Sequence, residues 1–228
     1  MRPTALQPAL LFDLDGTLVD SVYQHVLAWR EALEQAGIEL SVWRIHRRIG
    51  MSGGLFVNAL SRETGRDLGP EESRKVQEAH ARAFARQVGQ LRPLPGARRL
   101  LEQLTEMSIP WAIATSGGRQ TAVQTIGLLD ISSAAPLVTH DEVPFAKPDP
   151  HLFLTAAALL DVDIQNSIVI GDSVWDMLAA QRARALGVGL LSGGYGREEL
   201  ERAGAFRVYA DPADLSFHLD ELGIRVAH

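Results

Sequence analysis

Leu-Leu-Phe-Asp-Leu-Asp-Gly-Thr, residues 10–17, joins an apolar run to two carboxylates that are separated by one residue. Side chains alternate along an extended chain, so Asp13 and Asp15 can face the same way at the end of a strand. Neighbouring carboxylates repel each other, and one of them then needs a cation or a proton. This is the local chemistry of a metal-assisted nucleophile that forms an acyl phosphate. Gly16 and Thr17 add a turn and a hydroxyl.

Short apolar runs that end in polar or small residues recur along the chain. They cover residues 9–13, 111–115, 136–139, 167–172, 187–191 and, more weakly, 206–210. Helical patterns separate them at residues 97–106, 119–128, 149–160, 174–185 and 197–203. Alternating strands and helices imply right-handed crossovers and a mostly parallel sheet covered on both faces. The sequence therefore predicts an α/β fold with a Rossmann-like, doubly wound core.

An insertion of about 90 residues separates the first two strands, whereas a crossover needs only about 10–12. Its composition is helical: apolar residues form a stripe along 22–36, and helical character continues at 57–63 and 71–86. Two prolines at 92–96 then return the chain to the core. We predict a catalytic core at residues 1–20 and 92–228 and a small all-helical domain at 21–91.

The composition narrows the class of protein. The chain has 228 residues, is 46% hydrophobic and has a formal net charge of −6, which argues against nucleic acid as a partner. It has no cysteine, which excludes disulfides, thiol catalysis and zinc–thiolate sites. Residues 1–8 make a poor signal peptide, and no stretch approaches the ~20 apolar residues of a membrane span. We expect a cytoplasmic protein without a membrane partner.

Polar residues follow several of the predicted strands. They are Asp13 and Asp15 after the first, Thr115, Ser116 and Gly117 after the second, and Asp172 with Asp176 after the fourth. Lys147 precedes the helix that leads to the fourth strand. Ligands of open parallel sheets bind outside the carboxyl ends of the strands. The topology therefore brings four acids and one ammonium together; the acids need a cation, and Lys147 favours an anion.

These motifs resemble those of the haloacid dehalogenase-like hydrolases. Asp13-Leu-Asp15-Gly-Thr17, Thr115-Ser116, Lys147-Pro148 and Gly171-Asp172-Ser-Val-Trp-Asp176 match the four motifs of that superfamily in the right order. The helical insertion after the first motif resembles the helical-cap subtype. The tail from Gly193 to Leu200 resembles phosphoglycolate phosphatase-like members. The likeness covers almost the whole chain and implies the same core, with residues 21–91 as the cap domain.

The resemblance implies a Mg²⁺ site. Asp13, the backbone carbonyl of Asp15, and Asp172 would hold the ion, and Asp176 would reach it through water or steer Asp172. Ligation by oxygen alone, with retained waters, suits Mg²⁺.

The resemblance also implies roles at the phosphate. Asp13 would attack phosphorus, and Asp15 would protonate the leaving oxygen and then deprotonate the hydrolytic water. Lys147 would neutralise charge in the transition state. The phosphate-binding positions implied are Thr115, Ser116, Gly117 and Gly16.

Asp15 separates the reactions of the superfamily. Dehalogenases and phosphonatases lack an acid at this position, because their leaving groups do not need the proton. We therefore expect a phosphatase of small phosphomonoesters, of the phosphoglycolate or sugar-phosphate type. The alternatives are a beta-phosphoglucomutase-like phosphohexomutase and a catalytically silent phosphate-binding protein. The expected partner is a small phosphorylated metabolite, and the expected state is a monomer or a small homo-oligomer.

Three residues of the insertion are candidates for substrate binding. His25 lies beside the apolar stripe of the first helix, and the alternative is a satisfied interface histidine. Arg47 and Arg48 precede a glycine-rich loop, where a guanidinium can bind a second phosphate or a carboxylate. They can equally be solvated arginines at a helix end. Mutase-like members carry an arginine in this loop where this chain has Gly53, a departure that weighs against mutase activity.

Overall fold

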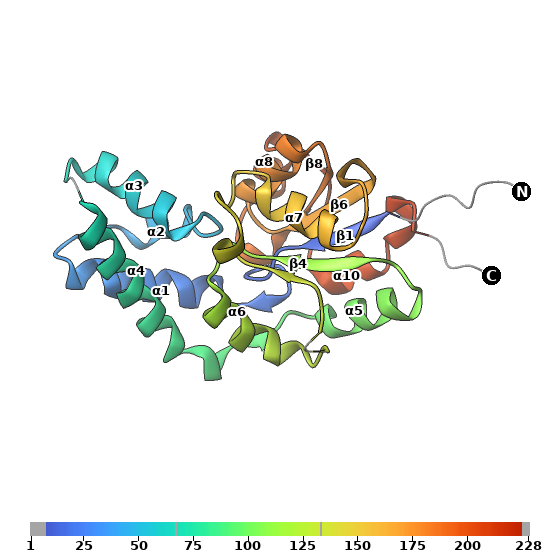
Figure 1. The fold of residues 1–228 in the computed structure, drawn as a ribbon, viewed down its shortest axis with the longest axis horizontal. Helices are drawn as coiled ribbons and strands as arrows, with labels where there is room; N and C mark the ends of the chain where they lie inside the picture. The colour runs from blue at the N-terminus through green and yellow to red at the C-terminus, as the bar shows by residue number, and fades with distance from the viewer. Residues whose placement is uncertain (1–7, 67, 133, 225–228) are drawn as a thin grey trace, which may run out of the picture.

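Six parallel strands form the central sheet of the structure, a computed structural model that describes residues 8–66, 68–132 and 134–224. Their spatial order is β5 (Leu137–Val138), β4 (Trp111–Ala114), β1 (Ala9–Phe12), β6 (Ser167–Gly171), β7 (Leu186–Leu190) and β8 (Ala205–Tyr209). Every neighbouring pair is parallel. The predicted α/β fold is confirmed, and each of the six runs lies within two residues of its strand (Figure 1).

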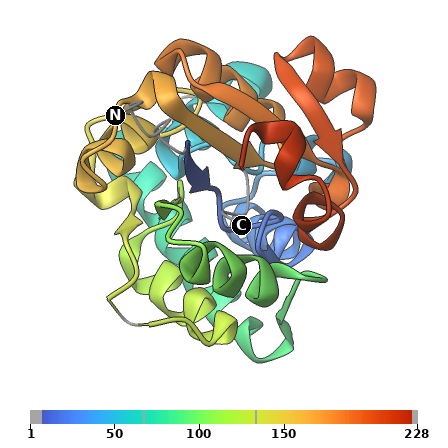
Figure 2. The ribbon, with the colours of Figure 1, turned by 90° about the vertical axis from the view of Figure 1, so that its right-hand side faces the viewer.

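Helices cover both faces of the sheet (Figure 2). Leu10 and Phe12 of β1 belong to one hydrophobic cluster, and Leu11 between them belongs to another, because side chains alternate along a strand. The first cluster includes residues of α5 (Ala97–Glu106), α6 (Arg119–Ile126) and α10 (Pro212–Ser216). The second includes residues of α7 (His151–Leu159) and α8 (Val174–Ala183). The helix α9 (Arg197–Arg202) packs against β7 and β8.

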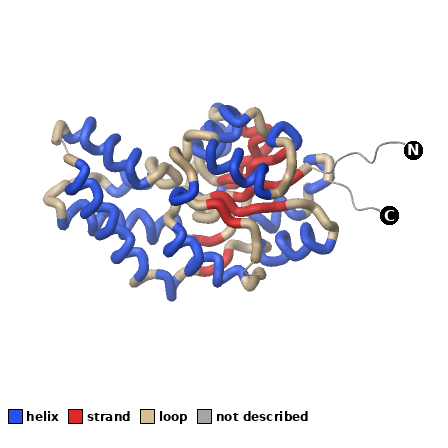
Figure 3. The backbone as a smooth tube through the Cα atoms, viewed as in Figure 1, coloured by secondary structure: helices blue, strands red, loops and turns tan. Residues whose placement is uncertain are grey.

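The insertion is helical and has a hydrophobic cluster of its own. Its helices are α1 (Val22–Gln35), α2 (Val42–His46), α3 (Gly53–Thr64) and α4 (Pro70–Ala85). The apolar stripe of α1 is buried in this cluster together with residues of α3 and α4. Figure 3 shows this part as helices and loops at one end of the molecule. We propose the boundaries 21–91 for this cap; the ends of the core range, 1–7 and 225–228, and positions 67 and 133 lie outside the described residues.

Two short elements of the insertion were given no residue range in the sequence-based prediction. The first is α2, which has only five residues. The second is an antiparallel pair, β2 (Val19–Asp20) with β3 (Arg92–Pro93), where the chain leaves and re-enters the core. Such short elements carry too few residues for a periodic pattern. The structure also has 3₁₀ turns at Val88–Gln90, Gly127–Leu129, His140–Glu142, Ile164–Asn166, Leu191–Gly193 and Leu219–Leu222.

The strand order positions the candidate site. Because β4, β1 and β6 are adjacent and parallel, the residues that follow them emerge at one edge of the sheet. None of the described helices combines the length and the apolar character that crossing a membrane requires.

Candidate active site

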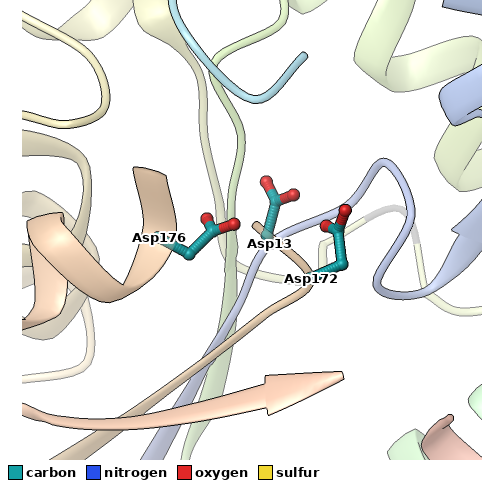
Figure 4. Close-up of side chains that lie close together, drawn as sticks. All are labelled: Asp13, Asp172 and Asp176. Carbon is teal, nitrogen blue, oxygen red and sulfur yellow. The ribbon is translucent and has the colours of Figure 1, made fainter. Parts of the chain in front are cut away.

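Three buried carboxylates meet at the carboxyl edge of the sheet. Asp13 follows β1, Asp172 follows β6, and Asp176 lies in the first turn of α8 (Figure 4). One oxygen from each lies within 4.8 Å of the others. All three side chains are almost fully shielded from solvent. The structure thus brings together three of the four acids that the sequence proposes as metal-site residues.

Lys147 supplies a single positive charge to this cluster. Its side chain is fully buried, and its ammonium contacts Oδ1 of Asp13 and lies 2.8 Å from Oδ1 of Asp176. Three carboxylates beside one ammonium leave an excess of negative charge. Burial, together with Asp176 and Asp15, raises the pKa of Asp13 to about 7 although Lys147 opposes the shift. Burial and the neighbouring Asp176 also raise the pKa of Asp172 well above its usual range.

This oxygen-only, electron-rich cluster fits a divalent cation. A bound cation would remove the repulsion that raises the two pKa values, and carboxylate oxygens are the ligands that Mg²⁺ takes in proteins. Both oxygens of Asp176 already have protein partners. Ser173 donates to Oδ2 from its amide at 3.1 Å and from its hydroxyl at 2.5 Å, and Lys147 faces Oδ1. These contacts favour the alternative in which Asp176 positions its neighbours.

Asp172 is held by close packing of the loops around it. The hydroxyl of Thr17 donates to its Oδ1 at 3.0 Å. A Cβ atom on Gly193 would lie 1.7 Å from its Oδ2, so no other residue fits there without displacing the carboxylate. Gly16 has a φ of +84° and a Cβ there would lie 2.6 Å from the same oxygen. Gly16 packs against Asp172 and is not among the residues that line the cleft described below; its expected contact with substrate stays a prediction.

Asp15 points away from the acidic cluster. Ser21 donates a hydrogen bond to its Oδ1 at 2.6 Å, and Nε2 of His25 lies 3.2 Å from the same oxygen. The hydroxyl of Thr115 lies 3.5 Å from Oδ2. Burial alone would raise the pKa of Asp15, but His25 and Ser21 outweigh it and hold that pKa below its ordinary value. The carboxylate of Asp15 is not part of the three-acid cluster, and the metal ligand expected from its backbone carbonyl stays a prediction.

His25 contacts a second histidine, which was not predicted from the sequence. Its Nδ1 lies 3.1 Å from Nε2 of His80, a residue of α4. The ring of His25 stacks on Phe84, and the ring of His80 stacks on Trp29. Burial lowers the pKa of His80 well below its usual range. A signal existed in the sequence, since His80 stands four residues after Val76 on the face of α4 that packs inward.

A cleft of about 300 Å³ lies between the core and the cap. From the core it is lined by Asp13, Asp15 and the loop Thr115-Ser116-Gly117, and from the cap by residues that include His25, Trp29, Arg48, Phe56, Gln77 and His80. The Ser116 hydroxyl is buried and has no hydrogen-bond partner among the described residues. A larger hollow of about 740 Å³ lies between α1 and α4 and contains none of the predicted site residues.

The two candidate arginines are placed differently. Arg48 lines the cleft, and its guanidinium bonds to the Arg44 carbonyl at 2.7 Å and to Glu63. Arg47 does not line the cleft. It pairs with Glu199 of the core and lies over the ring of Tyr195, 4.1 Å from its centroid. Arg47 follows the last residue of α2, where successive side chains diverge, and its side chain joins the cap to the core. Its expected contact with substrate stays a prediction.

Comparison with known proteins assigns the chain to a family. A profile of the haloacid dehalogenase-like hydrolases matches residues 8–184. The validoxylamine A 7′-phosphate phosphatase of Streptomyces hygroscopicus subsp. limoneus is 32% identical over 185 residues, 79% of this chain and 84% of that protein. The beta-phosphoglucomutase of Bacillus subtilis strain 168 is 30% identical over 217 residues, 92% of each chain.

A solved structure matches the fold closely. The crystal structure of a hydrolase from Pseudomonas syringae is 54% identical in sequence and superposes with a TM-score of 0.93, covering 95% of this chain and 99% of that one.

Proposed function

This chain belongs to the haloacid dehalogenase-like hydrolases, as its sequence motifs indicated, and we propose that it is a Mg²⁺-dependent phosphatase of small phosphomonoesters. One observation carries the proposal: a buried nucleophile candidate, Asp13, lies beside Lys147 and a cation-binding cluster, and Asp15 faces the same cleft with a different set of partners. A relative named as a phosphatase, 32% identical, supports it.

The first step is transfer of the phosphoryl group to the protein. Lys147 contacts Oδ1 of Asp13, which leaves Oδ2 to attack phosphorus. The new bond joins Oδ2 to phosphorus, and the ester P–O bond breaks as Asp15 delivers a proton to the departing alkoxide. Asp15 is ionised in the free protein, so it takes up this proton from solvent when the negatively charged phosphate binds beside it and raises its pKa. Ser116 and Thr115 border the space where the phosphoryl oxygens would lie, and the unpartnered hydroxyl of Ser116 can donate to one of them.

The second step is hydrolysis of the aspartyl phosphate. Asp15, now ionised, takes a proton from the attacking water, a new P–O bond forms, and the bond to Asp13 breaks to release phosphate. His25 and Ser21 stabilise the ionised form of Asp15 that this step requires. Mg²⁺, held by Asp13, Asp172 and the carbonyl of Asp15, would neutralise phosphoryl charge when bound.

The proposal is tested by assaying the purified chain with p-nitrophenyl phosphate and Mg²⁺. We expect turnover that chelation of the metal abolishes and that Asp13→Asn lowers to background, because the substituted amide is not a nucleophile. The matched control is Asp20→Asn, which changes an exposed aspartate outside the cleft. Binding of phosphate without turnover, or an unchanged rate in Asp13→Asn, would contradict the proposal.

Mutase activity is a second candidate, favoured by the likeness to a beta-phosphoglucomutase over 92% of each chain. A mutase must hold a second phosphate at the far end of its substrate. At the loop position where mutase-like members carry an arginine, this chain has Gly53, and Gln77 fills the adjacent space: a Cβ on Gly53 would lie 3.0 Å from its Oε1. Incubation with glucose 1-phosphate separates the two, because a mutase yields glucose 6-phosphate and a phosphatase yields free phosphate.

A further inference from the structure

We propose that the leaving group of the substrate is a neutral, hydroxylated alcohol of the sugar or polyol class, and not a carboxylate-bearing alcohol such as glycolate. This inference rests on the proposed phosphatase function and deepens it. It follows from the charges and surfaces of the cleft beyond the phosphate position.

The arginines in the part of the cleft beyond the phosphate position, which we call the leaving-group end, already pair with carboxylates of the protein. Arg48 pairs with Glu63, whose other oxygen contacts Arg44. On the core side, Arg119 pairs with Glu142 at 2.7 Å. Within the described lining of the cleft, these two arginines are the Lys or Arg side chains. Arg119 has its own carboxylate partner, and Arg48 shares Glu63 with Arg44.

An additional acid offsets the second arginine that Glu63 contacts and brings the formal charge of this group of residues to zero. Asp141 also lines the cleft, and its Oδ2 accepts a hydrogen bond from the backbone amide of Arg119 at 2.7 Å. Two neutralised arginines plus this acid leave no net positive charge at this end. A substrate carboxylate placed here would lose its hydration without gaining a free cation, which is unfavourable.

The walls suit a polyhydroxylated group instead. Trp29 and Phe56 form an aromatic pair with ring centroids 4.2 Å apart, and both line the cleft. Besides the charged residues already described, the lining offers uncharged hydrogen-bonding side chains, namely Gln77, Gln120, Thr121 and Ser116, together with His80, whose ring meets His25. Apolar faces with a few polar groups for orientation are the usual pattern of small-molecule sites.

The size of the cleft is consistent with a small sugar. Its volume of about 300 Å³ lies at the lower end of the range for small-molecule sites. The phosphate of the substrate occupies part of this volume, so the alcohol portion of the same substrate must be small.

The test compares kcat/KM for glucose 6-phosphate, sorbitol 6-phosphate and 2-phosphoglycolate, with p-nitrophenyl phosphate as the reporter of basic activity. We expect at least one of the two neutral-alcohol phosphates to exceed 2-phosphoglycolate by about tenfold or more. A preference for 2-phosphoglycolate with normal reporter turnover overturns this inference alone. Absence of turnover on all four overturns the proposed function, and this inference with it.

A variant tests the physical reason. Glu63→Gln releases Arg48 from its partner, so kcat/KM for 2-phosphoglycolate should rise by about tenfold while the reporter rate stays unchanged. The matched control is Glu72→Gln, which breaks the exposed cap pair with Arg66 outside the cleft and should change neither. An unchanged rate on 2-phosphoglycolate in Glu63→Gln, in a protein that melts normally, would overturn the assignment of specificity to these neutralised arginines.

Discussion

Two aspartates that stand two residues apart have opposite pKa shifts. Burial among acids raises the pKa of Asp13 to about 7, whereas His25 and Ser21 hold the pKa of Asp15 below its ordinary value against the effect of burial. When their surroundings shift the pKa values of two carboxyl groups in opposite directions, the two groups differ in protonation at the same pH and can take different roles in a reaction. At the residue scale, the proposed division between nucleophile and acid/base therefore depends on which loop each carboxyl faces.

His80 is predicted to act as a positioning residue for Asp15. His80→Phe keeps an aromatic ring against Trp29 but removes the nitrogen 3.1 Å from His25. We expect kcat for p-nitrophenyl phosphate to fall roughly fivefold to tenfold, the effect of one hydrogen bond of about 1 kcal/mol. His80→Gln, which keeps a donor and an acceptor, should recover part of the loss. If His80 serves only in packing, His80→Phe should instead keep full activity and His80→Gln should lose activity.

At the scale of elements, the end of α2 is a contact between cap and core. Nε2 of His46 lies 2.8 Å from the Gly193 carbonyl, and the hydroxyl of Tyr195 donates to the Arg47 carbonyl at 2.8 Å. The Arg47–Glu199 pair lies next to both. Since Gly193 also packs on Asp172, one loop contacts both the cap and a carboxylate of the acidic cluster.

Arg47→Ala and Glu199→Ala are predicted to act as one unit. Exposed ion pairs contribute about 0–1 kcal/mol, so each variant should lower kcat/KM by no more than roughly fivefold. The double variant should match either single one, because both remove the same contact. The measurement is a double-mutant cycle on kcat/KM at low and high salt. Additive losses, or a loss for Arg47→Ala that depends on the substrate's charge, would show instead that Arg47 contacts substrate.

At the scale of the whole molecule, the parallel sheet brings several aspartate side chains to one edge, where they are buried. Asp13, Asp172 and Asp176 face one another and Lys147, and Asp15 adds a further negative charge near Asp13. In the metal-free protein, the pKa of Asp13 is about 7, against 3.8 for an ordinary aspartate. The fold therefore binds more protons than the unfolded chain between these two values, and the contribution of Asp13 to stability falls as pH rises through this window.

Mg²⁺ affinity is predicted to increase with pH. The ion requires ionised carboxylates, so its binding at pH 6 must displace a proton from Asp13, whereas at pH 8 that carboxyl is already ionised. One displaced proton changes the apparent affinity by about tenfold between these values. Calorimetric titration at pH 6 and pH 8, in buffers with different protonation enthalpies, measures the affinity and the proton release. Equal affinities without proton release would contradict the raised pKa.

Much of the core was predictable from the sequence, and less of the cap was. The strands and the helix at Ala97–Glu106 match their predicted ranges because the apolar runs are long and bounded by turn residues. The five residues of α2 and the β2–β3 pair gave no periodic signal. Gly16 and Arg47, which were expected at the substrate, are not among the residues that line the cleft, whereas His80 and Gln77 line it and were not predicted.

The sequence by itself determined that Asp13, Asp172, Asp176 and Lys147 meet, because parallel strands deliver the residues that follow them to one edge of the sheet. It did not show that the Asp15 side chain faces Ser21 and His25 instead. Only the tertiary structure decided which cap residues face that edge and which charges are neutralised there. The Arg48–Glu63 pair and the His25–His80 contact join residues 15 and 55 positions apart. Their distances depend on how the cap helices pack on one another and on the core, and local periodicity along one helix does not specify that packing.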